Sequence, residues 1–288
     1  MKPNPECAPC LLKWVFERSE VLGSEESRLE LIKRIMRVLS KEFSSEVNVG
    51  VLSNKITGSI SDLLSHSADY YEGLKLKSNR IAKNLLPASV NFIERGRTPK
   101  ERFFRVCRLA SVSNVAPLGV PSETYRFPEV SHLLGSRSPL PRVTEEVLRA
   151  AKQATHVLYL ADNAGELGFD SLFIAKLREM GLRVTLIVKE GLFFEDATLK
   201  DAFFFRLDQS VEDVLTTQGF FVPSEGSPTQ REAFKKSDLV ISKGTGNYEA
   251  LNGEAEGKNV IYMLKVKCKP IAMRMGAALG SFVVKLEN

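Results

Sequence analysis

The sequence is poor in the residues on which several classes of protein depend. Four cysteines in 288 residues are too few for a disulfide-stabilised scaffold and fit a reducing compartment. His66, His132 and His156 are the only histidines, so a His-rich zinc site is excluded in practice, and no HExxH motif occurs. No apolar run reaches the roughly 18 residues of a membrane span, and the first residues lack the pattern of a signal peptide. We therefore expect a cytoplasmic protein without a membrane partner.

The charge balance is only mildly basic. Lys and Arg number 40 against 35 Asp and Glu, a formal net charge of +5. This surplus suits an anionic metabolite and is too small and too scattered to indicate a nucleic-acid partner. The hydrophobic share of 43% and the charged share of 26% are those of a globular protein. The length allows one large domain or two ordinary ones.

The chain changes character near residue 150. Apolar residues recur at helical spacing in four segments before that point: 25–43, 51–64, 72–86 (ended by Pro87) and 99–110. A segment rich in Pro, Gly and Ser, 116–141, then indicates a connection. Short apolar runs follow at 155–161, 182–189, 202–207, 238–242, 259–264 and 281–286, with a helix expected over 167–180. This alternation predicts an all-helical domain (1–140) and a three-layer α/β/α, Rossmann-like domain (141–288) with a mostly parallel sheet.

Polar side chains follow two of the expected strands. Asp162 and Asn163 end the run at 155–161, and Asp196 comes after the next run, 34 residues beyond Asp162. Such oxygen donors are suitable ligands for Mg²⁺ or Mn²⁺, and neighbouring parallel strands would bring them to one edge of the sheet. Helix caps are the alternative, because Asp and Asn commonly begin helices. Helical periodicity places two further acids, Asp170 and Asp201, on the surface.

A glycine-rich turn follows the run at 238–242. Its sequence, Lys243-Gly244-Thr245-Gly246-Asn247, is followed by an expected helix near Glu249. A strand, a glycine turn and a helix start together present backbone N–H groups to a phosphate, and a lysine adds a compact charge. The turn is neither a Walker A loop nor a GxGxxG motif. It predicts a phosphate site formed by Lys243 and the turn residues.

Taken in order along the chain, the motifs resemble the damage-control phosphatase family, also catalogued as domain of unknown function 89. The matching segments are Cys7-x-x-Cys10, Asp69-Tyr70-Tyr71 with Lys75, Lys77 and Asn79, Ser113-Asn114, Asp162-Asn163-Ala164-Gly165-Glu166, Asp196-Ala197-Thr198, Lys243 to Glu249, and Lys267-Cys268. The resemblance implies a helical domain on an α/β/α core and metal-dependent hydrolysis of phosphomonoesters. It also implies Asp162, Asn163 and Asp196 as ligands of Mn²⁺, Mg²⁺, Co²⁺ or Ni²⁺, with Asn114 and Lys267 at the substrate.

The residues themselves are compatible with this chemistry. Hydrolysis of a phosphomonoester needs neutralised phosphoryl oxygens and an in-line water, which a divalent cation, Lys243 and the turn amides would supply. Glu166 or Asp162 would orient or deprotonate the water, and a covalent aspartyl-phosphate is an open alternative. The substrate would be a small phosphorylated metabolite, such as a sugar phosphate or a damaged phosphometabolite.

Two other functions fit the same fold class. One is an S-adenosylmethionine-dependent carboxyl methyltransferase, and the other is a non-catalytic nucleotide-binding module. The first would require a richer glycine loop after the first strand, and the second would not require the acidic residues. Cys7 and Cys10 form half a zinc site. They have an accessory metal or redox role, or else they only pack the N-terminal segment.

Overall fold

A single six-stranded sheet forms the centre of the computed structural model, which describes residues 1–115, 127–135 and 141–288. The strands are β1 (His156–Leu160), β2 (Arg183–Lys189), β3 (Asp213–Thr217), β4 (Leu239–Lys243), β5 (Asn259–Lys265) and β6 (Phe282–Glu287). Their order across the sheet is β3-β2-β1-β4-β5-β6. All neighbours from β3 to β5 are parallel, and β6 runs antiparallel to β5. The predicted, mostly parallel sheet is confirmed.

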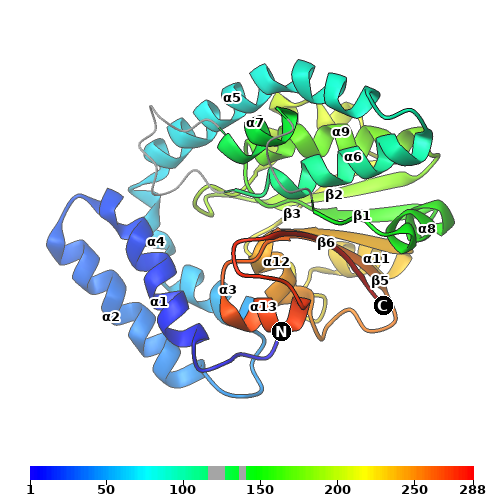
Figure 1. The fold of residues 1–288 in the computed structure, drawn as a ribbon. Coiled ribbons are helices and arrows are strands. Elements are labelled where there is room, and N and C mark those ends of the chain that lie inside the picture. Colours follow the sequence, from blue (N-terminus) through cyan, green and yellow to red (C-terminus); the bar gives the residue numbers. More distant parts are fainter. Residues whose placement is uncertain (116–126, 136–140) are drawn as a thin grey trace.

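Helices surround this sheet (Figure 1). They are α1 (Cys7–Arg18), α2 (Glu25–Glu42), α3 (Val49–Ser59), α4 (Ser61–Ser65), α5 (Ala68–Glu94), α6 (Pro99–Val112), α7 (Pro128–Leu134), α8 (Glu145–Gln153), α9 (Glu166–Glu179), α10 (Leu199–Phe204), α11 (Pro228–Lys236), α12 (Gly244–Leu251) and α13 (Lys269–Met275), with the 3₁₀ helices η1 (Ser19–Leu22) and η2 (Leu207–Gln209). In Figure 1, α5, α6 and α9 cover one face of the sheet, α11, α12 and α13 lie on the other, and α1 and α2 form a lobe beside it. This is the predicted three-layer arrangement.

The central strands β1 and β4 are buried along their whole length because helices cover both faces of the sheet. Val157 and Tyr159 of β1 belong to the core under α6 and α9, whereas Leu158 and Leu160 belong to the core under α12 and α13. Strand β1 also marks the point where the chain order reverses, since β2 lies on one side of it and β4 on the other. Open α/β sheets bind their ligands at the carboxyl ends of the strands at such a point.

The hydrophobic core continues across the predicted domain boundary near residue 141. Phe103 and Val106 of α6 share one buried cluster with Tyr159 of β1 and Phe173 of α9. Phe103 also contacts Phe173 edge to face, with ring centroids 5.9 Å apart. Helices α5 and α6 thus pack on the sheet as one of its covering layers, while α1 to α4 contribute to a third cluster around Leu31.

The strand predicted at 202–207 is wrong. Thr198 and Asp201 form a capping box that begins helix α10, so the aromatic run that follows is helical. The third strand of the sheet is β3, which the sequence analysis missed. It is an edge strand whose residues are mostly only half-buried, so the apolar signal of a central strand is absent.

Pro87 does not end its helix, contrary to the prediction. Helix α5 runs through Pro87 to Glu94 instead of ending before it. Pro87 is exposed, so water can satisfy the carbonyl group that the proline leaves without a backbone partner. The predicted connection at 116–141 contains helix α7, and its segments 116–126 and 136–140 lie outside the described residues.

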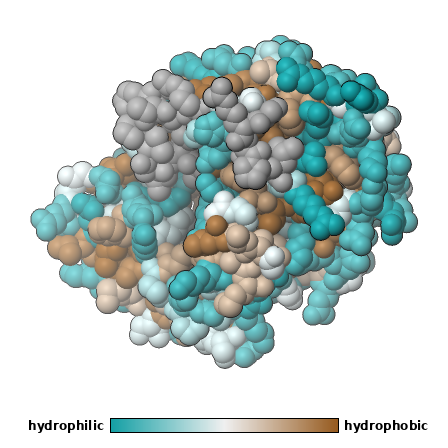
Figure 2. Space-filling view, viewed as in Figure 1, coloured by the Kyte–Doolittle hydropathy of each residue, from teal (hydrophilic) through white to brown (hydrophobic). Residues whose placement is uncertain are grey.

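Some of the apolar residues at helical spacing in the segment 25–43, which forms α2, face solvent. Ile35 and Leu31 of α2 are buried, but Leu29 and Met36 are 55% and 56% exposed. Figure 2 shows apolar side chains on the surface of this lobe. No helix in the described ranges is long and apolar enough to cross a membrane.

Close packing of α3 on α12 yields a stability prediction. A Cβ atom added to Gly50 would lie 2.5 Å from the Cβ of Ala250, whereas one added to Gly58 of the same helix would meet nothing within 4 Å. We expect Gly50→Ala to lower the free energy of unfolding by about 1–3 kcal/mol, the usual cost of overpacking. Gly58→Ala should leave it unchanged or raise it by up to about 1 kcal/mol. Urea unfolding of both variants tests this, and equal effects would contradict the close contact.

Candidate functional site

A cavity of about 460 Å³ opens at the carboxyl ends of β1 and β4. Its walls come from helix α1, from the loops after β1 and β2, and from the first turns of α12 and α13. Asp162, Asn163 and Asp196 all line it. The carboxyl-edge position is the one that the sequence predicted for these residues.

The loops after β1 and β2 are joined by backbone pairing. Asn163 and Asp196 form an isolated antiparallel bridge. The Ala197 N–H donates to the Asp162 carbonyl (2.7 Å), and the Ala164 N–H donates to the Glu195 carbonyl (3.0 Å). This pairing brings Asp196 to the same cavity wall as Asp162, as expected from their strand-end positions.

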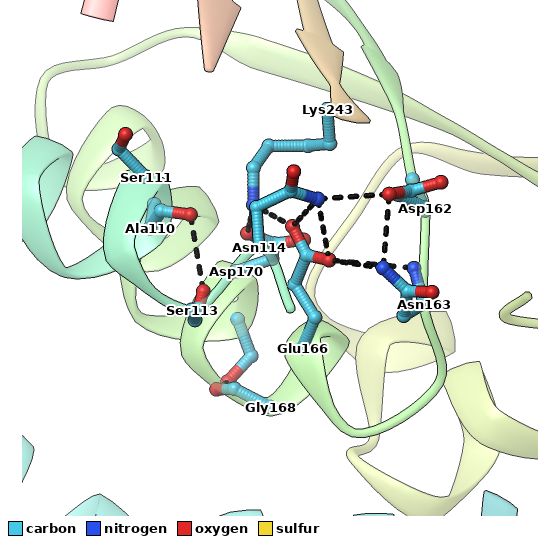
Figure 3. A network of polar contacts seen from close by, with 12 residues as sticks. Ala110, Ser111, Ser113, Asn114, Asp162, Asn163, Glu166, Gly168, Asp170 and Lys243 are labelled. Atoms are coloured by element: carbon cyan, nitrogen blue, oxygen red, sulfur yellow. Dashed lines mark hydrogen bonds and ion pairs between the residues drawn. The ribbon is translucent and has the colours of Figure 1, made fainter. Parts of the chain in front are cut away.

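Two amide side chains and one glycine fix the Asp162 carboxylate. Asn114, just after α6, donates from Nδ2 to Asp162 Oδ2 (2.8 Å), and Asn163 Nδ2 donates to the same oxygen (2.9 Å) (Figure 3). Gly244 lies against this carboxylate, since an added Cβ would be 2.1 Å from Oδ2. Gly244 also has φ +81°, a conformation that favours glycine. The glycine of the turn is therefore needed for the approach of α12 to Asp162.

Lys243 does not face the cavity. Its side chain has no exposed area, and its ammonium pairs with Glu166 and with Asp170 Oδ1, the latter at 2.6 Å (Figure 3). Neither Lys243 nor Glu166 lines the cavity. Direct phosphate binding by Lys243 stays a prediction, and this geometry does not favour it.

The two acids predicted on the surface are both buried. Asp170 follows Glu166 by one helical turn and therefore faces the same lysine. Asp201 is 3% exposed and pairs with Lys75 at 2.9 Å. It also accepts a hydrogen bond from Asn79 (2.7 Å). Both acids are buried because each pairs with a buried lysine from another element. Helical periodicity alone does not reveal such a partner.

Two cations that the sequence analysis missed hold the Asp196 loop. Lys189, the last residue of β2, has its Nζ 3.4 Å from Asp196 Oδ2 and donates to the Gly219 carbonyl (3.1 Å). Arg18 of α1 pairs with Glu195 through two nitrogens. A lysine at the end of a buried strand could have indicated the first contact. The second joins residues 177 positions apart and has no local signal.

Negative charge exceeds positive charge around this end of the cavity. The buried acids and bases of the site are Asp162, Glu166, Asp170, Glu195 and Asp196 against Arg18, Lys189 and Lys243. Five carboxyl groups thus face three buried cations, so the buried acids outnumber the buried bases by two. Asp196 Oδ2 is also buried without a hydrogen bond.

Burial is the main cause of the raised pKa values of these acids. Burial, together with the neighbouring Glu166, raises the pKa of Asp162 to about 6. Burial raises the pKa of Asp196 well above its ordinary value, although Lys189 opposes the rise. Burial also raises the pKa of Glu166 and of Asp170 despite their contact with Lys243.

The remaining predicted residues divide between the cavity and the interior. Thr245, Gly246 and the exposed Lys267 line the cavity. Lys267 is close enough to Asp162 to oppose the rise of that carboxyl's pKa. Asn247 is buried and donates to the Ala161 and Lys243 carbonyls, so its amide is used within the fold.

The cysteines divide in a similar way. Cys7, Cys10 and Cys268 line the cavity, and Cys107 is fully buried on α6. Among the described residues, no three His, Cys, Asp or Glu side chains are grouped as a metal site requires. A cation at the Asp162 end of the cavity would therefore depend on the amide oxygen of Asn163 as well.

Comparisons of the sequence and of the structure with known proteins point to the same family. Residues 4–283 match the model of the damage-control phosphatase ARMT1-like domain. A damage-control phosphatase of Archaeoglobus fulgidus is 26% identical over 99% of each chain, and one of Pyrococcus horikoshii is 27% identical over 98% of this chain and 97% of its own. The crystal structure of a DUF89 family protein from Pyrococcus horikoshii superposes with a TM-score of 0.80 and 27% identity, covering 99% of this chain and 98% of that one.

Glu249 of α12, half-buried in the cavity wall, carries a pH prediction. Burial raises its pKa from 4.5 to about 7, although the N-terminal amine and Lys267 oppose the rise. Because the folded chain holds this proton more tightly, the contribution of Glu249 to stability is complete below pH 4.5 and lost as the pH rises through about 7. Burial also raises the pKa of the nearby thiols, so they stay protonated in this range: Cys7, Cys10 and Cys268.

Glu249→Gln removes the charge that is costly at high pH. We expect its melting temperature to exceed that of the wild type at pH 8 by roughly 2–4 °C, which corresponds to about 1 kcal/mol for a chain of this size. No such gain should remain at pH 4.5. A difference that is the same at both pH values would contradict the raised pKa.

Proposed function

Because the chain belongs to the damage-control phosphatase family with an ARMT1-like domain, we propose that it hydrolyses small phosphorylated metabolites with the aid of a divalent cation. The cation would be held by Asp162, Asn163 and Asp196. The relatives with a named activity are phosphatases, which favours hydrolysis over the methyltransferase and the non-catalytic alternatives.

The excess of buried acids over buried bases at the site is the observation that carries this proposal. Five buried carboxyl groups around three buried cations are costly in a protein interior, and a single divalent cation would offset this excess. Asp162 and Asp196 supply carboxylate oxygens to the cavity, and the buried Asp196 Oδ2 has no hydrogen bond. Carboxylate and amide oxygens are hard ligands of the kind that Mg²⁺ and Mn²⁺ take. The donor set therefore fits such an ion, and we extend the proposal to Co²⁺ and Ni²⁺.

The chain's own residues would bind and orient the phosphate. When bound, a divalent cation supplies Lewis acidity toward the phosphoryl group and the attacking water. Lys267 is an exposed cation that lines the cavity and acts on Asp162. No side chain caps the first turn of α12, where Thr245 and Gly246 line the cavity, so the N–H groups there can bind phosphoryl oxygens. Asp162 is the acid that we assign to orienting the water.

The first test concerns the ligands. Asp162→Asn and Asp196→Asn should each lower turnover of p-nitrophenyl phosphate by more than about 100-fold, because loss of a ligand's mere supporting partner already costs about 10- to 100-fold. The metal-free variants should be at least as stable as the metal-free wild type, because each change removes one carboxyl group from a site where buried acids outnumber buried bases. Thermal unfolding with and without Mn²⁺ measures this.

The exposed Asp208 supplies the control, since Asp208→Asn should retain both turnover and stabilisation by Mn²⁺. If either ligand variant unfolds in the absence of metal, its carboxylate is a structural cap and the metal assignment is wrong.

The second test concerns the phosphate. Lys267→Met should lower kcat/KM by about 10- to 150-fold, the equivalent of one charge-assisted hydrogen bond of roughly 1.5–3 kcal/mol. Its stability should stay within about 0.5 kcal/mol of wild type because the residue is exposed. Lys269→Met is the matched control, since Lys269 is exposed nearby but does not line the cavity. Equal losses of kcat/KM in the two variants would show that Lys267 acts only through the positive charge of this surface and does not contact the phosphate.

A further inference from the structure

A fully buried charge triad lies directly behind the cavity wall. Glu166 and Asp170 project from consecutive turns of α9, and Lys243 reaches between them from the last residue of β4 (Figure 3). None of the three side chains has exposed area, and none lines the cavity. The triad therefore cannot contact a substrate in the cavity directly.

Glu166 is saturated by donors from inside the protein. Lys243 and Asn114 donate to its Oε1, and Asn114 and Asn163 each donate from Nδ2 to its Oε2 at 2.9 Å. A carboxylate with both oxygens engaged in this way has no lone pair aimed at a water in the cavity. Glu166 is therefore poorly placed to act as the general base that the sequence analysis considered.

The contacts of Glu166 instead determine the orientation of an amide. The NH₂ group of Asn163 is held by Glu166 Oε2 and by Asp162 Oδ2 (both 2.9 Å). An amide carries its oxygen and its nitrogen on opposite sides of the group, so fixing the nitrogen inward turns Oδ1 outward. Figure 3 shows the Asn163 oxygen on the side away from Glu166. The same interactions therefore set which atom of Asn163 is offered to the cavity.

We propose that Lys243 and Asp170 are positioning residues that hold Glu166, and through it Asn163, in the orientation that binds the cation. Lys243 fixes Glu166, and Asp170 fixes Lys243 from its other side. This inference rests on the proposed function for its cation. It gives the conspicuous lysine of the glycine turn a role behind the site in place of phosphate binding.

Asp170→Asn is the variant that separates these roles. It keeps the shape of the side chain and removes one of the two negative charges that hold the Lys243 ammonium. We expect the dissociation constant for Mn²⁺, measured by calorimetry, to rise about 10- to 100-fold, the range found for residues that support metal ligands. The KM for p-nitrophenyl phosphate at saturating Mn²⁺ should change less than about twofold, because Lys267 and the α12 amides are untouched. Glu166→Gln should weaken Mn²⁺ binding at least as much. The NH₂ group of the new glutamine would compete with the oxygen that now accepts the hydrogen bond from Asn163.

Asp238→Asn is the control for a purely structural effect. Asp238 accepts three hydrogen bonds from Thr155 and His156 at the opposite end of the sheet. This variant should lose stability but bind Mn²⁺ as the wild type does. Each protein is measured well below its own melting temperature, so that only folded molecules are compared.

These measurements test the positioning role and the metal site separately. Wild-type Mn²⁺ affinity in folded Asp170→Asn would overturn the positioning role, as would a rise in KM without a change in metal affinity, which would return Lys243 to the phosphate. If the wild type binds Mn²⁺ and the variant binds it weakly, the inference holds even where no phosphatase activity is found. A wild type that binds no divalent cation would overturn the metal site itself, and this inference with it.

Discussion

The site depends on an excess of buried negative charge at the carboxyl end of β1. Burying a carboxylate without a partner is expensive, and here five are gathered around three cations. The cations come from separate parts of the fold: Arg18 from α1, Lys189 from the end of β2 and Lys243 from the end of β4. Burial raises the pKa of Asp162 and Asp196, and the neighbouring acids add to the rise. A divalent cation at the two acids would complete the balance.

The N-terminal helices are part of this site and not an appended layer. Asn114, at the end of α6, donates to both Asp162 and Glu166, and its Oδ1 accepts from the Lys265 backbone of β5. Helix α1 supplies one wall of the cavity, and Arg18 is fixed there by the rings of Trp14 and Phe194 (5.5 and 5.2 Å from its guanidinium carbon). The sheet therefore positions the acids, while the helices set their hydrogen bonds and close the cavity.

Much of this arrangement could be predicted from local patterns. Apolar runs followed by polar turns correctly placed Asp162, Asn163 and Asp196 at one edge of a parallel sheet. The direction in which a side chain points could not be predicted in the same way. Lys243 follows a strand and precedes a glycine turn, which suggests an outward charge, yet the acids one turn apart on α9 draw it inward. The pair of Arg18 with Glu195 had no local signal, because only the folded chain brings together residues so distant in sequence.

The most direct test of the account is binding of Mn²⁺ to the chelator-treated wild-type protein, with bound metal and hydrolysis of p-nitrophenyl phosphate measured on the same samples. The charge balance predicts one tightly bound ion per chain at the Asp162 site, and hydrolysis that rises in proportion to the bound ion. Hydrolysis that is undiminished by chelation, or a protein that binds no Mn²⁺ at all, would contradict it.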